Sequence, residues 1–442
     1  MMCAKVEGKA RKVIERDSKV MINTTREHYP FVAEKGDGDF AYDISGEKLI
    51  DFSSFIGVYT LGVNSNESIR KAIHSQVDRL MHSAFTDFYS EPPVTFTEKL
   101  LAMFPKGFGR AFFSNSGTEA NEAAIKLSRL YTKRPYLISF YNAFHGRTMG
   151  SLGLTASKPI QKEHFGPFSG VVQAHFPSPY RCELNHDHNH DCATACIDYI
   201  KRNIFGKIVP AKEVAAIFFE PIQGEGGYIV PPKDFFRQLR ELADEHQILL
   251  VSDEIQAGYM RTGKFLALDN FGVQADIYTM AKALGGGLPI GATITRHSLG
   301  NIPNGAHANT FGGNLVSIAA ANASLDYVIK NKKGLEAQVA AKGKYVMKRL
   351  SELKEDYEIV GDVRGIGLMI GAELVKSKRT KEYAIKERAK VLDECFTNGL
   401  LLLPCGTSTI RIIPPITISK ASLEKGMDIF EGAIRSANKD LR

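Results

Sequence analysis

The chain has 442 residues, of which 44% are hydrophobic and 24% are charged, with 56 Lys and Arg against 49 Asp and Glu. This composition is typical of a soluble globular protein, and no apolar run is long enough to span a membrane. The charges are scattered, which argues against a nucleic-acid-binding arm. Residues 1–19 are charged and precede no apolar run, so we do not expect a secretory signal. Six cysteines do not make a disulfide scaffold at this length, and we expect a cytoplasmic protein.

Strand-like apolar runs alternate with helical stretches between residues 66 and 323. Residues 215–222 are typical of a strand, residues 235–247 of an amphipathic helix and residues 248–255 of the next strand. Short apolar runs bounded by polar turns indicate strands that are buried on both faces. Their alternation with helices predicts a large α/β domain with a mostly parallel sheet.

The pattern changes near residue 324. Lysine-rich helical stretches there surround two short strand-like runs, at 367–375 and 400–406. Together with the N-terminal residues, these elements predict a smaller α/β lobe that is built from both chain ends. We place this lobe at residues 1–65 and 324–442, and the large domain at residues 66–323.

Polar residues stand where strand-like runs of the large domain end. Glu220 follows one run, and Asp253 ends a second, with Gln256 three residues later. Lys282 follows a third run and precedes three glycines. Ligands of parallel α/β sheets bind at the carboxyl ends of strands, so we expect these side chains to converge. Taken singly, an Asp here is a turn or cap residue and a Lys is a solvated side chain. The apolar flanks of Lys282 favour a buried amine that can form a Schiff base.

A helix start and an aromatic residue add to this set. Ser116, Gly117 and Thr118 precede a good helix-forming stretch, and such a helix N-terminus can cradle a phosphate. Simple N-capping is the plainer alternative for this segment. Phe144 lies beside His145 in the sequence FHGRT, where an aromatic ring can either stack on a planar ligand or belong to the core.

Six motifs occur in one order along the chain: SNSGTEANEAA (114–124), YNAFHGRTMG (141–150), FFEPIQGEGG (218–227), VSDEIQAGYMRTGKF (251–265), AKALGGGLPIGA (281–292) and NTFGGNL (309–315). In these motifs the chain resembles the pyridoxal-phosphate-dependent aminotransferases of fold type I, class III, the omega-amino acid group. With weaker similarity on either side, the resemblance covers nearly the whole chain. It implies the type I α/β fold and pyridoxal 5'-phosphate as cofactor.

The resemblance also implies roles for individual residues. Lys282 binds the cofactor covalently and then carries a proton, and Asp253 pairs with the pyridine nitrogen. Gln256 hydrogen-bonds near the phenolic oxygen of the ring, and Phe144 stacks on the ring. The full cofactor-binding set expected from the resemblance is Ser116, Gly117, Thr118, Phe144, His145, Asp253, Gln256, Lys282 and Thr310.

Substrate recognition and assembly follow from the same resemblance. Arg411 matches the arginine that takes an α-carboxylate, and Glu220 matches the acid that masks this arginine when an omega-amino acid binds. Arg147 matches the arginine that 4-aminobutyrate aminotransferases use for the distal carboxylate, and Ile56 matches a pocket residue. Thr310 is expected to reach the phosphate of the neighbouring subunit. This implies a homodimer or a dimer of dimers with shared active sites, and no nucleic-acid or membrane partner.

The predicted reaction is transfer of the amino group of an omega-amino acid, best 4-aminobutyrate, to 2-oxoglutarate. A racemase or epimerase of the same family and an ornithine or acetylornithine aminotransferase remain open. Racemisation needs an acid–base group on the face opposite Lys282, which the sequence alone does not locate. A cofactor-free binding protein is disfavoured because Lys282 and Asp253 are both present.

Residues 181–196, RCELNHDHNHDCATAC, concentrate three cysteines and three histidines. A structural zinc site usually pairs its ligands as C-x₂-C with a second spaced pair, and this segment lacks that pattern. We therefore predict a solvated insertion and no metal in the active site. Metal binding by this short histidine-rich tract is the alternative that stays open.

Overall fold

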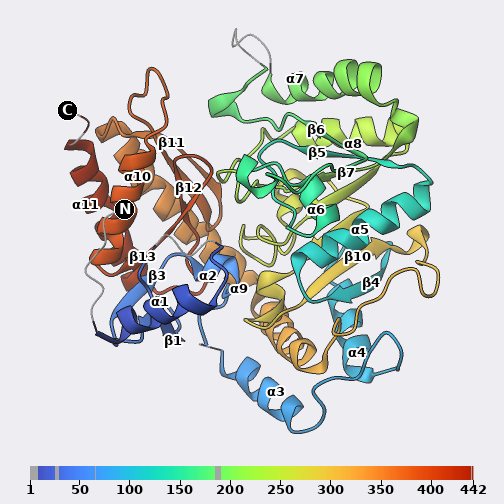
Figure 1. The fold of residues 1–442 in the computed structure, drawn as a ribbon, viewed down its shortest axis with the longest axis horizontal. Helices are drawn as coiled ribbons and strands as arrows, with labels where there is room; N and C mark the ends of the chain where they lie inside the picture. Colours follow the sequence, from blue (N-terminus) through green and yellow to red (C-terminus); the bar gives the residue numbers. More distant parts are fainter. Residues whose placement is uncertain (1–7, 25–28, 65, 185–190, 440, 442) are drawn as a thin grey trace. The chain divides into compact units, whose positions relative to one another are not determined.

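The computed structural model describes residues 8–24, 29–64, 66–184, 191–439 and 441 (Figure 1). The chain divides into two units, one made of residues 1–66 and 341–442 and the other of residues 67–340. The division between residues 340 and 341 falls inside the long helix α9 (Leu315–Asp356), whereas the sequence pattern placed this boundary at residue 324.

The larger unit contains a seven-stranded sheet with the order β4-β10-β9-β8-β7-β5-β6. Its strands are β4 (Phe108–Ser114), β5 (Tyr136–Phe140), β6 (Val171–Ala174), β7 (Val214–Phe219), β8 (Leu249–Asp253), β9 (Ile277–Met280) and β10 (Gly291–Arg296). The strands β9, β8, β7, β5 and β6 run parallel to one another, and β10 runs antiparallel to β9 and β4. The predicted type I fold with a mostly parallel sheet is confirmed.

Helices cover both faces of this sheet. The helices of the unit are α3 (Glu67–Val77), α4 (Glu91–Leu101), α5 (Gly117–Thr132), α6 (Met149–Leu154), α7 (Cys192–Tyr199), which continues as a π-helical stretch (Ile200–Ile208), α8 (Phe235–His246) and the first part of α9. Successive side chains of a strand point to opposite faces. Phe218 belongs to the core cluster with Ile125 of α5, whereas the ring centroid of Phe219 lies 4.8 Å from that of Phe236 on α8. Both faces of β7 are thus buried, which explains its unbroken apolar sequence.

The smaller unit contains two four-stranded sheets, β1-β2-β3-β13 and β11-β12-β15-β14. Their strands are β1 (Ala33–Asp37), β2 (Phe40–Asp43), β3 (Lys48–Asp51), β11 (Val360–Ile366), β12 (Met369–Leu374), β13 (Leu400–Leu401), β14 (Leu403–Cys405) and β15 (Thr409–Ile412). The helices are α1 (Gly8–Val20), α2 (Ser54–Gly57), α10 (Ile385–Thr397), α11 (Lys420–Lys439) and the end of α9.

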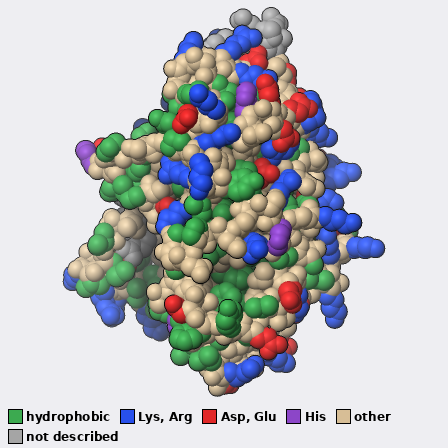
Figure 2. All heavy atoms as spheres, turned by 90° about the vertical axis from the view of Figure 1, so that its right-hand side faces the viewer, with side chains coloured by type: hydrophobic (Ala, Val, Ile, Leu, Met, Phe, Trp, Pro, Cys, Tyr) green, Lys and Arg blue, Asp and Glu red, His purple; other side chains and the backbone are tan. Residues whose placement is uncertain are grey.

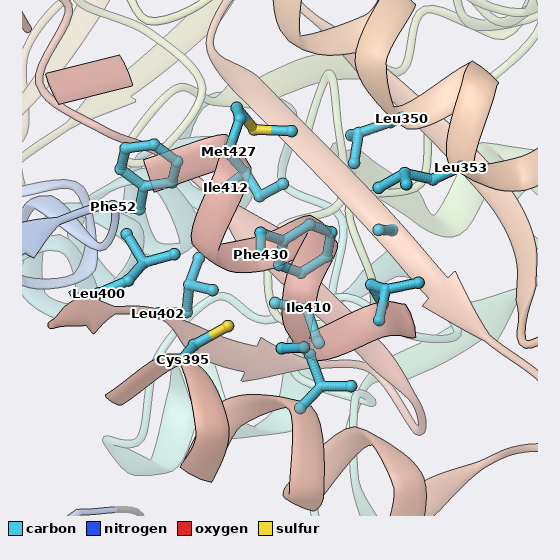
Figure 3. Packing of buried hydrophobic residues seen from close by; sticks show 14 of the residues in the cluster. Phe52, Leu350, Leu353, Cys395, Leu400, Leu402, Ile410, Ile412, Met427 and Phe430 are labelled. Carbon is cyan, nitrogen blue, oxygen red and sulfur yellow. The ribbon is translucent and has the colours of Figure 1, made fainter. Parts of the chain in front are cut away.

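One expected strand of this unit is in fact two. Residues 400–406 form β13, which pairs in parallel with β3, and β14, which pairs antiparallel with β15. The chain changes sheets at Leu402, so a single apolar run supplies both sheets. Leu402 itself joins the core cluster that Figure 3 shows, together with Phe52, Met427 and Phe430.

The surface carries mixed side chains. On the face drawn in Figure 2, Lys and Arg side chains lie among acidic and hydrophobic ones. Among the helices of the described residues, none is both long and apolar enough to cross a membrane.

Candidate active site

The carboxyl ends of three neighbouring parallel strands carry the residues that the sequence singled out. Glu220 directly follows β7, Asp253 is the last residue of β8, and Lys282 comes two residues after β9. These strands are adjacent in the order β9-β8-β7, so their ends share one edge of the sheet. A short 3₁₀ turn, Lys282–Gly285, begins at the lysine itself.

Asp253 is buried and held on both carboxylate oxygens. Its Oδ2 accepts a hydrogen bond from Asn121 Nδ2 at 2.8 Å and lies 2.8 Å from His145 Nδ1. Its Oδ1 accepts the backbone N–H of Ile255 at 3.1 Å. The carboxylate is therefore fixed in orientation, and its bond to Nδ1 places a proton on that nitrogen of His145 when Asp253 is ionised.

Asn121 belongs to this arrangement, although the sequence analysis did not single it out. Its Nδ2 also donates to the backbone oxygen of His145 at 2.7 Å, and its Oδ1 accepts from Thr279 Oγ1 at 2.9 Å. The residue is completely buried on α5. An amide side chain among the alanines on the buried face of α5 is the sequence signal that identifies it.

Nε2 of His145 and Oε1 of Gln256 are buried polar atoms near this edge that have no hydrogen-bond partner among the described residues. Buried polar groups are usually paired, so unpaired ones at a strand edge suit a polar ligand. Gln256 also packs closely on Gly224, where a Cβ atom would lie 2.8 Å from its Oε1.

Glu220 is buried, and two backbone N–H groups hold its carboxylate. Its Oε1 accepts the N–H of Phe144 at 2.7 Å, and its Oε2 accepts the N–H of Gly224 at 2.7 Å. Burial raises the pKa of Glu220 to about 7, and the nearby carboxylate of Asp253 acts in the same direction. The side chain is thus fixed within its own unit and partly neutral at neutral pH.

The start of α5 has the form expected of an anion site. Ser116 is the N-cap, and its side chain accepts the N–H of Glu119 at 3.4 Å. Gly117 fits closely against Ile255, where a Cβ atom would lie 2.6 Å from the side chain. Thr118 Oγ1 lies 2.8 Å from Thr148 Oγ1 within a group of hydroxyls. Helix N-termini of this kind present backbone N–H groups to anions.

Phe144 and Arg147 lie together on the segment that follows β5. Phe144 is half-buried and Arg147 is exposed, with its guanidinium carbon 5.7 Å from the centre of the Phe144 ring. Lys282 is half-buried and has a φ of 44°, in the left-handed region that non-glycine residues rarely adopt. Such backbone strain concentrates at functional sites.

The remaining predicted residues come from other segments of the chain. Thr310 is exposed in the larger unit, within a turn that Asn309 ties to the backbone oxygen of Phe113 at 3.0 Å. Ile56 and Arg411 belong to the smaller unit. Ile56 is 49% exposed and has a φ of 66°. Arg411 is buried on β15, and its Nε and Nη2 donate to the backbone oxygen of Pro404 at 3.0 and 2.7 Å.

His186, His188 and His190 of the predicted solvated insertion lie outside the described residues. Cys182, Cys192 and Cys196 are described, and all three are free thiols. Within the described part of the chain, no group of three or more His, Cys, Asp or Glu residues is arranged to hold a metal ion.

A strand-end carboxylate, a lysine after the next strand and a helix N-terminus at the same sheet are the parts that a pyridoxal-phosphate enzyme of fold type I requires. Residues 21–434 match the family described as Aminotransferase class-III. The chain belongs to this family, and its cofactor is pyridoxal phosphate.

Relatives within the family differ in their reactions. The chain is 40% identical over 425 residues to the leucine/methionine racemase of Thermococcus litoralis, covering 96% of this chain and 95% of that protein. It is 37% identical over 426 residues to the acetylornithine aminotransferase of Clostridium acetobutylicum, covering 95% of this chain and 100% of that protein. A solved amine transaminase from an uncultivated Pseudomonas species, in its pyridoxal-phosphate-bound form, is 29% identical with a TM-score of 0.87 and covers 95% of this chain and 98% of that chain.

Proposed function

We propose that the edge formed by β7, β8 and β9 binds pyridoxal phosphate. Lys282 binds it covalently, Asp253 hydrogen-bonds its ring nitrogen, and the side-chain amide of Gln256 hydrogen-bonds near its phenolic oxygen. Phe144 stacks on the ring. The fixed carboxylate of Asp253 and the unpaired atoms of His145 and Gln256 support this assignment.

The phosphate of the cofactor lies at the start of α5 in this proposal. The backbone N–H groups of Gly117 and Thr118 and the hydroxyl of Thr118 hold it, and Ser116 shapes the first turn. Close packing at Gly117 supports this, because only a residue without a side chain lets the first turn of α5 lie this close to Ile255.

Replacing the lysine tests the cofactor site. Lys282→Ala should abolish turnover and prevent covalent attachment of the cofactor, while the protein still folds and retains some cofactor noncovalently. The readout is the mass of the denatured protein after borohydride reduction, with the exposed Lys106→Ala as the matched control. A cofactor adduct on the Lys282→Ala chain would assign the attachment to another lysine.

The proposed assembly is a homodimer in which Thr310 reaches the phosphate bound by the partner. The exposed position of Thr310 supports it. Thr86 Oγ1 donates to the oxygen of Asn309 at 3.3 Å, so residues near 86 and 309 lie together. Large hydrophobic side chains are exposed on these two segments: Leu80 53%, Met81 60%, Phe88 68%, Tyr89 103% and Phe311 58%. Apolar exposure of this extent is typical of an interface.

The reaction we propose is racemisation of neutral α-amino acids. The observation that carries this proposal is the 40% identity, across 96% of the chain, to a leucine/methionine racemase. When bound, pyridoxal phosphate stabilises the negative charge that remains on the α-carbon after proton loss. Lys282 Nζ exchanges a proton with one face of this carbon, and racemisation requires a second proton carrier on the opposite face.

The geometry of Glu220 supports an α-amino acid substrate. An acid that masks a substrate-binding arginine has to be charged and able to move. Glu220 accepts two backbone N–H groups at 2.7 Å, and burial raises its pKa to about 7. We therefore propose that Glu220 stays in place and does not mask Arg411, whose guanidinium is the group suited to an α-carboxylate.

A chiral assay tests the reaction. The cofactor-loaded enzyme is incubated with L-leucine or L-methionine in heavy water without any 2-oxo acid. A racemase accumulates the D-amino acid with deuterium at the α-carbon. If the amino acid is unchanged and 2-oxoglutarate must be added before any amino group moves, the enzyme is an aminotransferase and the racemase proposal is wrong.

Aminotransfer from an omega-amino acid, best 4-aminobutyrate, to 2-oxoglutarate is the second candidate. Arg147 favours it, because an exposed guanidinium next to the proposed stacking ring can take a distal carboxylate. The identity to an acetylornithine aminotransferase supports a related donor. Production of glutamate from 2-oxoglutarate with a panel of 4-aminobutyrate, acetylornithine and ornithine distinguishes these donors.

A further inference from the structure

Three thiols meet in the segment between β6 and α8, and none of them belongs to the proposed cofactor-binding set. Sγ of Cys192 lies 2.8 Å from Sγ of Cys182. Cys192 opens helix α7, and Cys196 follows one helical turn later with its thiol hydrogen-bonded to that of Cys192. Cys182 is half-buried, whereas Cys192 and Cys196 are 9% and 1% exposed. Cys182 is thus the thiol of the three that a small molecule in solution reaches first.

Local structure fixes the central thiol. Asp191 caps α7, accepting the N–H groups of Ala193 at 3.3 Å and Thr194 at 3.2 Å. Thr194 Oγ1 donates to Gln238 Oε1 of α8 at 3.2 Å, which anchors the helix start to its neighbour. The sulfur of Cys192 is therefore held by a helix with defined partners.

The environment of Cys192 favours its thiolate. Hydrogen bonds from Cys196 and Cys182, together with one from the backbone of Ser178, lower the pKa of Cys192. The hydrogen bond to Cys192 and burial raise the pKa of Cys196. Of Cys192 and Cys196, Cys192 is thus the thiol whose ionised form is favoured, and a thiolate is the form that attacks a disulfide.

We propose that Cys182 and Cys192 form a reversible intramolecular disulfide in this protein. Their sulfur atoms already touch, and a disulfide bond of about 2.05 Å requires them to approach by less than about 1 Å. A metal-thiolate site is the competing use of such a row, and protection of all three thiols by bound zinc would be its signature.

The oxidant in this proposal is a low-molecular-weight disulfide. The thiolate of Cys182 attacks one sulfur of this disulfide, forms a mixed disulfide and releases one small thiolate. The thiolate of Cys192 then attacks the sulfur of Cys182, forms the Cys182–Cys192 bond and releases the second small thiolate. Two protein thiols are oxidised, the small disulfide is reduced to two thiols, and the two protons from the cysteines pass to these products.

The bond joins the segment after β6 to the start of α7. It closes a short loop, and a cross-link of this kind stabilises a fold mainly by restricting the unfolded chain. We expect oxidation to raise the midpoint temperature of unfolding of the cofactor-loaded protein by about 2–6 °C. Reduction with dithiothreitol should reverse the shift.

The test combines alkylation with peptide mapping. The cofactor-loaded wild-type protein is treated with oxidised glutathione, the free thiols are alkylated, and the digest is analysed by mass spectrometry. A linked peptide pair containing Cys182 and Cys192, lighter by two hydrogen atoms than the reduced pair, is the expected result. Cys395 is the internal control, because it is completely buried and burial raises its pKa, so it should not be oxidised.

Variants complete the test. Cys182→Ser and Cys192→Ser should each lose the linked pair and the rise in midpoint temperature, whereas Cys405→Ser should keep both. Recovery of Cys182 and Cys192 only as free thiols or glutathione adducts would overturn the proposal, as would a Cys192–Cys196 link. So would zinc at one equivalent per chain that protects all three thiols from alkylation in the untreated protein.

Discussion

One side-chain amide, that of Asn121, holds three groups of the site at once. It donates to Asp253 and to the backbone oxygen of His145, and it accepts from Thr279. All of these groups are buried, so none of them can turn to water when the amide is removed. The site therefore depends on a residue that need not contact the cofactor.

Asn121→Ala should lower the free energy of unfolding by about 1–3 kcal/mol, the cost of leaving buried partners unpaired. It should also weaken cofactor binding, because Asp253 loses one of its supports. Urea denaturation and cofactor titration measure the two effects. Ser128→Ala is the matched control, since this residue is buried on the same helix and its hydroxyl has no partner among the described residues. Equal effects of the two changes would contradict the role given to Asn121.

Two buried glutamates make stability depend on pH. Burial raises the pKa of Glu220 and of Glu254 to about 7. Between their ordinary pKa and about 7 the folded chain holds protons that the unfolded chain has lost, so these groups make the free energy of unfolding fall as the pH rises. The slope is roughly 1.4 kcal/mol for each pH unit and each group.

Replacing Glu254 tests this dependence. Its carboxylate accepts the N–H groups of Ala267 at 2.7 Å and Leu268 at 3.0 Å, and it lies outside the proposed cofactor-binding set. Glu254→Gln cannot ionise, so its free energy of unfolding should fall less steeply between about pH 5 and pH 7 than that of the wild type. Urea denaturation across this range measures the slopes. Parallel slopes for the two proteins would show that Glu254 is ionised throughout.

At the scale of elements, α11 packs against the rest of the smaller unit through a glycine. A Cβ atom on Gly426 would overlap the ring of Phe52, which is completely buried. Gly432 lies on the same helix, and a Cβ atom there would meet nothing within 4 Å. Comparing Gly→Ala changes at these two positions therefore separates the effect of core packing from the effect of the helix propensity of alanine.

Gly426→Ala should lower the free energy of unfolding by about 1–3 kcal/mol, the usual cost of overpacking a core. Gly432→Ala should raise it by about 0.5–1 kcal/mol, because alanine is the better helix former. Denaturant unfolding of both variants measures the difference. Phe52→Leu in the Gly426→Ala background should recover part of the loss. Equal responses at the two glycines would mean that the helix moves away from Phe52 without cost.

A strand that is buried on both faces could be predicted from the sequence. Two strands that lie in one continuous apolar run could not be told apart. The apolar run of β7 ends at Glu220 because both faces of the strand are covered, so the strand and the polar residue after it were visible in the sequence. The run at 400–406 is equally apolar, but it serves two sheets, and only tertiary pairing distinguishes β13 from β14.

Some residues of the candidate site could likewise be predicted from the sequence, and others could not. Residues at strand ends were predictable because parallel strands gather their carboxyl ends. Asn121 was missed because its partners come from three separate segments, a relation that the sequence spacing of one helix does not contain. The fixed position of Glu220 was likewise not predictable, because it depends on the backbone N–H groups of Phe144 and Gly224.

For the whole molecule, the proposed dimer predicts that one subunit alone cannot form a complete active site. If Thr310 serves the phosphate bound by the partner, Lys282 and Thr310 of one active site come from different chains. Thr310→Glu should weaken cofactor binding, because the introduced carboxylate repels the phosphate. Lys282→Ala should be inactive by itself.

A mixture of these two variants tests the shared site. In a hybrid dimer, the active site that contains the intact Lys282 receives the intact Thr310 from the other chain, and the second active site carries both changes. Unfolding and refolding the two variants together should therefore restore activity in about a quarter of all sites, because half of the random dimers are hybrids with one intact site. Measuring activity at limiting cofactor, with each variant refolded alone as the control, detects this recovery. If Thr310 instead acts within its own chain, every site with an intact Lys282 also carries the Thr310→Glu change and stays defective, and mixing the variants restores nothing.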